Sequence, residues 1–365
     1  MTVTVRDIER ALLNAFPFER AEGWDRGGLL AGDPDREVTG VVLALDPTIS
    51  ALSDAASMGA NVLVTHHPVF LEPPKTLKPG AGPGGVVFAA LDAGIALINC
   101  HTNLDRDAQG QRLIPEALGL SPVAPLERGS MPMSLVTVYV PEGAREAVTA
   151  AMAGAGAGRI GDYTGCNFTD NGVGRFTPST DAAPCVGAPG TPSEAEEARV
   201  EMVCARGAAT SVLAAAIAAH PYEEPLVTVS DVAIARNGAA MGMVCDAGSV
   251  TLRELVERCA STFGVTPRVW GDPDTTISRL VTSTGSAGAL LREVRACGAQ
   301  ALVAGEVRYH DALDAMESGL AIVELGHDVS EWPLVTLLER VVRGIDGLDP
   351  DTIVSLPATA AWWTP

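Results

Sequence analysis

Short runs of consecutive apolar residues alternate along most of the chain with segments in which apolar residues recur every three or four positions. The runs are typical of strands buried on both faces, and the wider spacing is typical of amphipathic helices. In the first third of the chain, buried strands are expected at residues 41–46, 62–65 and 95–98, and helices at residues 5–16, 49–58 and 86–92. This alternation predicts an α/β fold with a largely parallel sheet.

The pattern changes between about residues 131 and 231. Strands are expected at 135–140, 199–204 and 226–229, helices at 144–152 and 208–219, and a long glycine-rich stretch runs from 154 to 190. Two strand-helix-strand halves in series are typical of a ferredoxin-like domain. The segment His220–Glu224 follows the second helix, and we interpret it as a helix end in preference to a ligand loop.

The order of the first segment returns after residue 252. Residues 298–303 mirror residues 59–64, and each run leads into a loop with a histidine, His310 in one case and His66 in the other. Such a repeat predicts two similar three-layer α/β halves that face each other across one site. The sequence therefore divides into residues 1–128, an inserted α+β domain at 129–235, and residues 236–365.

The second strand of each repeat ends in a histidine and an acid: His101 with Asp105, and His327 with Glu331. Five of the six histidines fall at predicted strand ends. Imidazole and carboxylate without thiolate suit Zn, Mn, Fe or Co, and they leave coordination positions open for water. The four-residue spacing from His327 to Glu331 places both side chains on one face of a helix. Two metal ions about 3.5 to 4 Å apart need a bridging carboxylate, and Asp105 and Glu331 are the candidates.

Composition narrows the class of protein. The 365 residues, 47% hydrophobic and 19% charged, indicate a globular protein of more than one domain. The net charge of −20 disfavours nucleic acid as a partner. No apolar window is long enough for a membrane span, and the amino terminus does not resemble a signal peptide. Seven scattered cysteines without a Cys-x-x-Cys pair argue against a disulfide framework and favour a reducing cytoplasm.

Weaker candidates have a structural and a functional interpretation. Asp46 ends the first strand, and a helix-capping role is favoured over a site role. Lys75 and Lys78 are the only lysines and can meet an anionic substrate, although solvated loop charges are commoner. The turn Ser283–Gly288 can hold a phosphate on its amides or contain glycine for packing. Cys100, beside His101, is interpreted as a core residue, because no serine or cysteine has a nucleophile signature.

The ordered motifs resemble one family across nearly the whole chain, the NGG-one-interacting-factor-three-like family, also labelled GTP cyclohydrolase one, type two. The motifs are Trp24-Asp25 with Gly28-Leu29, Gly59 to Pro68, His101 to Asp105, Gly305-Glu306 with His310-Asp311-Ala312, and Gly326-His327 with Glu331-Trp332-Pro333. The middle segment, with Gly158 to Tyr163 and His220 to Glu224, is similar to the insertion of the longer bacterial members, which has a fold like that of nitrogen-regulatory PII proteins.

The resemblance implies two divalent metal ions per chain, with His66, His67, Asp105, His327 and Glu331 as ligands. It also implies a ring-shaped homohexamer, a trimer of dimers, with the sites facing an internal cavity. All five ligand positions are present. The chain departs from the family outside this set, with Arg26-Gly27 where members often have Asn-Val, and with Tyr309 where they have His.

Two functions are compatible with these residues. The first is a metal-dependent hydrolase acting on a small molecule, in which a metal lowers the pKa of water and His101 or His310 donates a proton to the leaving group. The family label implies the purine nucleotide GTP as substrate, and the residues themselves do not specify it. The second is a non-catalytic, metal-binding regulatory protein whose inserted domain senses a small effector. A catalytic site leaves a metal position open to water, whereas a structural site is closed by protein.

Overall fold

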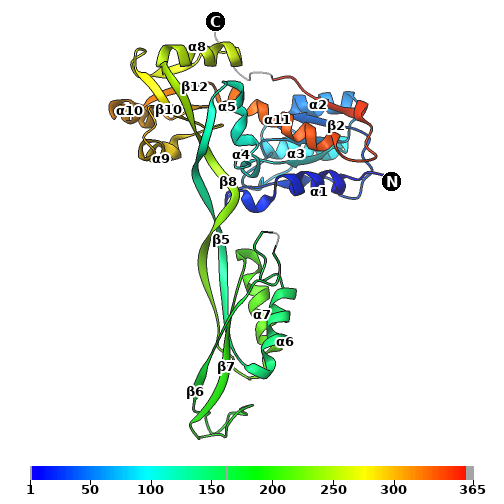
Figure 1. Ribbon diagram of the computed structural model, residues 1–365. Coiled ribbons are helices and arrows are strands. Elements are labelled where there is room, and N and C mark those ends of the chain that lie inside the picture. Colours follow the sequence, from blue (N-terminus) through cyan, green and yellow to red (C-terminus); the bar gives the residue numbers. More distant parts are fainter. Residues whose placement is uncertain (1, 162, 359–365) are drawn as a thin grey trace. The chain divides into compact units, whose positions relative to one another are not determined.

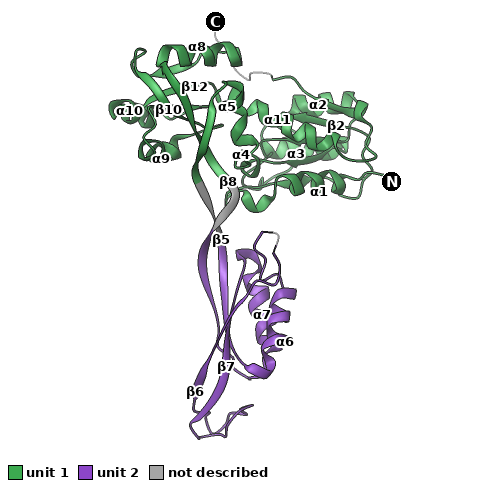
Figure 2. Cartoon of the chain, viewed as in Figure 1, with its two compact units in different colours: residues 1–129, 238–365 green, residues 130–237 purple. Residues whose placement is uncertain are grey.

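The computed structural model describes residues 2–161 and 163–358 of the 365-residue chain. It is a mixed α/β protein with eleven α-helices in the described residues. The chain forms two compact units (Figure 2): unit 1 comprises residues 1–129 and 238–365, and unit 2 comprises residues 130–237. The long strands β5 (Ser121–Pro141) and β8 (Val227–Thr251) each begin in one unit and end in the other. No helix in the described part of the chain is long and apolar enough to cross a membrane.

One sheet of unit 1 contains the strands that lead into His66, His67 and His101. Its strand order is β1-β4-β3-β2-β13. The bounds are β1 (Gly28–Ala31), β2 (Val41–Ala44), β3 (Val62–Thr65), β4 (Ala96–Asn99) and β13 (Ile353–Ser355). All neighbours pair in parallel except β1, which runs antiparallel to β4. Every residue of β2, β3 and β4 is buried, as the continuous apolar runs predict.

Helices cover both faces of this sheet (Figure 1). Because side chains alternate along a strand, Val64 packs with α1 (Val5–Ala15) and α11 (His327–Arg343) on one face. Leu63 packs with α2 (Ile49–Ser57) and α3 (Pro83–Ala93) on the other. The C-terminal part of the sequence thus supplies both a helix and the edge strand β13 to a sheet built from the first hundred residues.

The remaining strands of unit 1 form a second sheet around parallel β10, β11 and β12. The C-terminal part of β8 pairs antiparallel with β10, and β9 pairs antiparallel with β12. The bounds are β9 (Arg268–Trp270), β10 (Thr276–Thr282), β11 (Ala301–Ala304) and β12 (Ala321–Glu324). One face packs with α5 (Leu113–Ala117) and α8 (Leu252–Phe263), and the other with α9 (Leu291–Ala296) and α10 (Tyr309–Glu317).

Unit 2 has the element order β5-α6-β6-β7-α7-β8. The further bounds are α6 (Arg145–Gly154), β6 (Phe168–Phe176), β7 (Ser193–Ala205) and α7 (Ala209–Ala219). The sequence analysis missed β6, which lies inside the glycine-rich stretch 154–190 and has no buried residue. Hydrophobic patterning cannot detect such a strand, since the pattern records burial.

Replacing Leu63 by Ala tests whether the sheet of β3 determines the stability of unit 1. Leu63 is fully buried, so we expect the free energy of unfolding to fall by about 2 to 5 kcal/mol. The same substitution at Leu91, which is 50% exposed on α3, should change it by less than about 0.5 kcal/mol. Urea unfolding followed by tryptophan fluorescence reports unit 1, because all five tryptophans lie outside residues 130–237. Equal losses in the two variants would contradict the packing described.

Candidate metal centre

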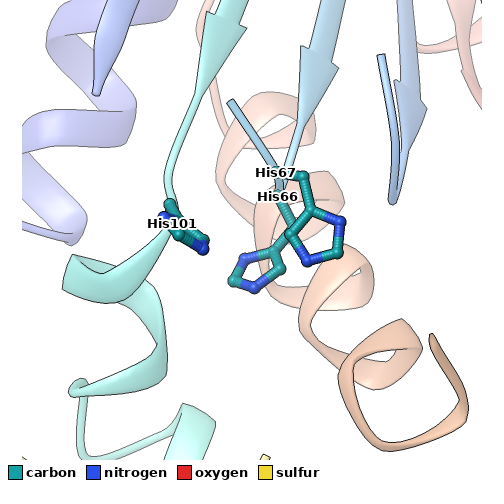
Figure 3. A group of neighbouring side chains, drawn as sticks. All are labelled: His66, His67 and His101. Carbon is teal, nitrogen blue, oxygen red and sulfur yellow. The ribbon is translucent and has the colours of Figure 1, made fainter. Parts of the chain in front are cut away.

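The histidines predicted for the site, apart from His310, meet where β3, β4 and the first turn of α11 come together. His66 and His67 follow β3, His101 follows β4, and α11 begins at His327. The rings of His66, His67 and His101 gather at the ends of these strands (Figure 3), with centroids 5.0 to 5.7 Å apart. The ring of His327 lies 5.5 Å from that of His67. Glu331 comes one helical turn after His327, as the four-residue spacing predicts.

Each of the two imidazoles that follow β3 is held by a hydrogen bond at Nδ1. His66 Nδ1 lies 2.9 Å from the carbonyl oxygen of Cys100, and His67 Nδ1 lies 2.7 Å from Asp46 Oδ1. A carbonyl and an ionised carboxylate only accept hydrogen bonds, so Nδ1 carries the hydrogen in both rings. In the neutral imidazole, Nε2 then has the free lone pair that a metal ion binds.

The other two imidazoles are fixed in the same way. His327 Nδ1 lies 3.1 Å from Glu306 Oε1, and His101 Nδ1 lies 2.8 Å from Asp25 Oδ1. Asp25 is buried and also accepts hydrogen bonds from the amide and hydroxyl of Thr102. Although burial opposes ionisation, the hydrogen bonds from His101 and Thr102 lower the pKa of Asp25. An outer acceptor therefore sets the orientation of every ring in the cluster.

The Nε2 atoms converge on two buried carboxylates. Glu331 Oε2 lies 2.8 Å from His67 Nε2 and 3.0 Å from His327 Nε2. His66 Nε2 lies 3.6 Å from Asp105 Oδ2 and 3.9 Å from Glu331 Oε1. His66 is fully buried, and Asp105 and Glu331 are 4% and 3% exposed. Polar atoms so deep in the protein require partners.

These residues fit a divalent metal ion. His66 Nε2 is buried and has no hydrogen-bond partner among the described residues. A nitrogen atom that binds a metal ion is expected in such a place. Three groups of side chains have ligand atoms within 4.8 Å of one another: His66, His67 and His101; His67, His327 and Glu331; and His66, Asp105 and Glu331. Nitrogen and carboxylate oxygen together suit Zn, Mn, Fe or Co.

Electrostatics ties the protonation of the imidazoles to Glu331. Burial opposes the charged form of His67, but Asp46 and Glu331 raise its pKa to about 10. The hydrogen bond to Glu331 raises the pKa of His327 to about 9. Burial raises the pKa of Asp105. Burial also opposes ionisation of Glu331, but its hydrogen bonds with His327 and His67 hold its pKa well below the usual value. Without a metal ion, protons on the imidazoles balance the charge of Glu331.

The turn after β10 packs against the cluster. Thr284 Oγ1 donates a hydrogen bond of 2.7 Å to Asp105 Oδ1, and the amide of Gly285 donates to Ser330 Oγ. Gly285 has φ +55°, and a Cβ atom there would collide with Glu331 Oε1. The amides of Ser283, Gly285 and Ala287 all donate to protein acceptors. Of the two interpretations of this turn, the structure therefore favours packing over phosphate binding.

Sequence reasoning missed the outer partners of the rings. Asp46 was interpreted as a helix cap, which is wrong: Thr48 caps α2 and Asp46 contacts His67. No role was predicted for Asp25 or Glu306 beyond their place in motifs. For Asp46, its position in the sequence indicates a place in the site. Asp46 closely follows β2, just as His66 and His67 closely follow the neighbouring strand β3.

Some predicted residues lie apart from the cluster. His310 is exposed on the first turn of α10, where its ring contacts Tyr309, and none of the metal-competent groups found in the described residues includes it. Lys75 and Lys78 are exposed in the loop before α3. His220 ends α7 in unit 2, which agrees with its interpretation as a helix end.

Comparison with known proteins identifies similar chains. The sequence model of the Duf34/NIF3 (NGG1p interacting factor 3) family matches residues 3–354. A Mycobacterium tuberculosis protein named GTP cyclohydrolase 1 type 2 homolog is 33% identical over 370 residues, covering 99% of this chain and 97% of that protein. A Halalkalibacterium halodurans protein of the same name is 32% identical, covering 93% and 92%.

Solved structures show the same fold. A Bacillus cereus protein related to NIF3 has a TM-score of 0.66 and 29% identity, and the match covers 100% of both chains. A Staphylococcus aureus protein has a TM-score of 0.72 and 23% identity, covering 100% of this chain and 99% of that chain.

We expect the metal-free protein to lose stability as the pH rises above neutrality. The folded-state pKa values of His67 and His327, about 10 and about 9, exceed the ordinary histidine pKa of about 6.5. Their stabilising contribution is therefore complete below about pH 6.5 and is lost as the pH rises through about 9 to 10. Urea unfolding in the presence of a chelator across this range measures it. The variant Glu331→Gln, which lacks the balancing charge, should show a flatter dependence; an unchanged dependence would refute the coupling.

Proposed function

Because the chain belongs to the Duf34/NIF3 family, we propose that it is a metal-dependent hydrolase with a dinuclear centre. The ligands would be His66, His67, Asp105, His327 and Glu331. One observation carries this proposal: three imidazoles have Nδ1 held by outer acceptors while Nε2 is directed at two buried carboxylates. Imidazole ligands oriented by outer partners are a general property of metal sites in proteins.

Glu331 is the side chain that would join the two metal positions. It belongs to the group with His66 and Asp105 and to the group with His67 and His327. Its oxygens have separate environments, with Oε2 near His67 and His327 and Oε1 nearer to His66. A carboxylate shared by two groups of candidate ligands would suit a centre with two metal ions rather than one.

His101 would act as the proton donor. A divalent metal ion supplies Lewis acidity and lowers the pKa of water toward neutrality. Asp25 holds His101 through Nδ1, so that Nε2 remains free to exchange a proton at the cluster. The 15% exposed side chain of His101 retains access to solvent. We assign this role to His101 instead of His310, because His101 lies within 6 Å of the other rings.

The proposed substrate is a purine nucleotide such as GTP. Relatives that match nearly the whole chain are named GTP cyclohydrolase 1 type 2 homolog. Opening the imidazole ring of guanine is a hydrolysis in which water adds to an electrophilic ring carbon and a carbon–nitrogen bond breaks. A site with activated water beside a proton donor suits this chemistry.

The alternative is a metal-binding regulatory protein whose unit 2 senses a small effector. Unit 2 supports it, because its β-α-β-β-α-β order is that of a ferredoxin-like domain, and we propose that this is a PII-like insertion. We also propose that the parallel cores β2-β3-β4 and β10-β11-β12 represent two related halves. The homohexamer is a further proposal, which light scattering in solution tests.

Metal analysis combined with a GTP hydrolysis assay separates the two functions. We expect about two metal ions per chain in protein purified without added metal, and hydrolysis of GTP by that protein. Glu331→Gln should lose most of the metal and the activity together, because Glu331 contacts both ligand groups. Glu317→Gln, at an exposed position of α10, is the matched control. Bound metal without GTP turnover would overturn the cyclohydrolase assignment and support the regulatory alternative.

The role of His101 is tested by His101→Asn. We expect turnover to fall at least about 100-fold, while metal content stays at the wild-type level. Asp25→Asn should reduce turnover less, and it should move the pH profile by removing the charge beside Nδ1. If His101→Asn loses metal instead, His101 is a metal ligand, and another group must supply the proton.

A further inference from the structure

Unit 2 contains a cavity of about 920 Å³, and no residue of the candidate metal centre lines it. It opens on the face of the sheet away from the helices. Val138 and Val200 pack against α6 and α7, so their neighbours Tyr139 and Arg199 face the other side, where both line the cavity. The volume lies within the range of small-molecule sites.

The floor of the cavity lacks side chains at two positions of β6. Gly172 and Gly174 pair with Glu197 and Ala195 of β7. A Cβ atom at Gly172 would meet only open space, whereas one at Gly174 would collide with the carboxylate of Glu197. Glycine weakens a strand interior and often marks a position where a ligand approaches the backbone. The two glycines therefore give a ligand access to Glu197.

The motif after α7 forms one wall. His220 Nδ1 accepts a hydrogen bond of 3.0 Å from the amide of Tyr222, and its Nε2 therefore donates to the carbonyl of Tyr139 at 2.8 Å. Both nitrogens of His220 are thus used inside the domain, and they fix the start of the loop. Tyr222 then packs against Phe176, with ring centroids 6.1 Å apart. The histidine is the anchor of this wall, and the tyrosine faces the ligand space.

The loop 177–186 forms the opposite wall. The amide of Ala183 donates to both carboxylate oxygens of Glu223, at 3.2 and 3.3 Å. This contact links the loop to the motif after α7, so the two walls support each other. The site is therefore built by residues distant in sequence, and it does not consist of a single surface loop.

The charge of the lining is strongly acidic. Seven charged residues belong to the lining, five acids and two arginines: Asp170, Asp181, Glu197, Glu223 and Glu224, with Arg175 and Arg199. Arg175 pairs with Glu194 at 2.7 Å, and Arg199 Nε lies 3.5 Å from Glu201. Acids outside the lining thus contact both arginines, and the five acids of the lining outnumber the two arginines, which favours a positive ligand.

The Tyr222 hydroxyl provides a neutral partner beside Glu197. It is buried and has no hydrogen-bond partner among the described residues. Burial and the nearby carboxylate of Glu197 raise the pKa of Tyr222, so the hydroxyl stays protonated. It can accept a hydrogen bond from an ammonium group, and the rings of Tyr139, Phe176 and Tyr222 can hold a cation or an aliphatic chain.

We propose that this cavity binds an organic cation, an amine or guanidine with an aliphatic body, between Glu197, Tyr222 and the glycine floor of β6. The site is independent of the metal centre and of the reaction proposed for it. Carboxylates select the charge, and the apolar and aromatic wall selects the body of the ligand.

The test is calorimetric titration of the full-length protein with spermidine and agmatine at physiological salt, which suppresses diffuse binding to a chain of net charge −20. We expect saturable binding that weakens at least tenfold in Glu197→Gln, in Tyr222→Phe and in Gly172→Val, which fills the floor without changing charge. Glu196→Gln, at an exposed position of the same strand outside the lining, is the matched control and should bind as the wild type does.

Hydrogen exchange with and without spermidine locates the ligand. Protection is expected in residues 170–186 and 222–226. The proposal is overturned by the absence of saturable binding, by equal weakening in Glu196→Gln, by protection confined to unit 1, or by anions such as citrate binding in place of amines. If Gly172→Val fails to fold, as judged by circular dichroism, the two conservative variants at Glu197 and Tyr222 still decide the question.

Discussion

The carboxylate of Glu331 is the point on which the candidate site depends. It is nearly excluded from solvent, and it lies within hydrogen-bond distance of two imidazoles. An isolated carboxylate in such a place would be very costly in free energy. The fold therefore has to supply positive charge around it. Either protons on the histidines or metal ions can do so, and the two compete for the same Nε2 atoms.

Hydrogen-bond acceptors outside the cluster fix the rings for which protons and metal ions compete. Cys100, Asp46 and Glu306 each hold one ring through Nδ1. Rotation of the rings is thereby restricted, and the lone pairs remain directed inward when a proton leaves. The arrangement is preorganised for a cation, because little side-chain entropy remains to be lost on binding.

Much of this candidate site could be predicted from the sequence, because candidate ligand residues at strand ends follow a simple rule of parallel sheets. The positions of His66, His67 and Asp105 follow from their strands, and His327 with Glu331 from helical spacing. The outer partners could not be predicted, since contacts such as His67 with Asp46 join separate loops. Strand β6 was also missed, because neither of its faces is buried and its glycines resemble a loop. The cavity of unit 2 depends on that strand, so it was equally hidden.

The contribution of α11 and β13 to the first sheet has a consequence for biosynthesis. A ribosome makes the strands with His66, His67 and His101 more than two hundred residues before it makes His327 and Ile353. Until those residues emerge, the apolar face of Val64 lacks α11, and β2 has an open edge. Unpaired strand edges and uncovered apolar faces favour aggregation of nascent chains. The first sheet therefore stays incomplete during an extended period of synthesis, and the site around Glu331 can form only late in translation.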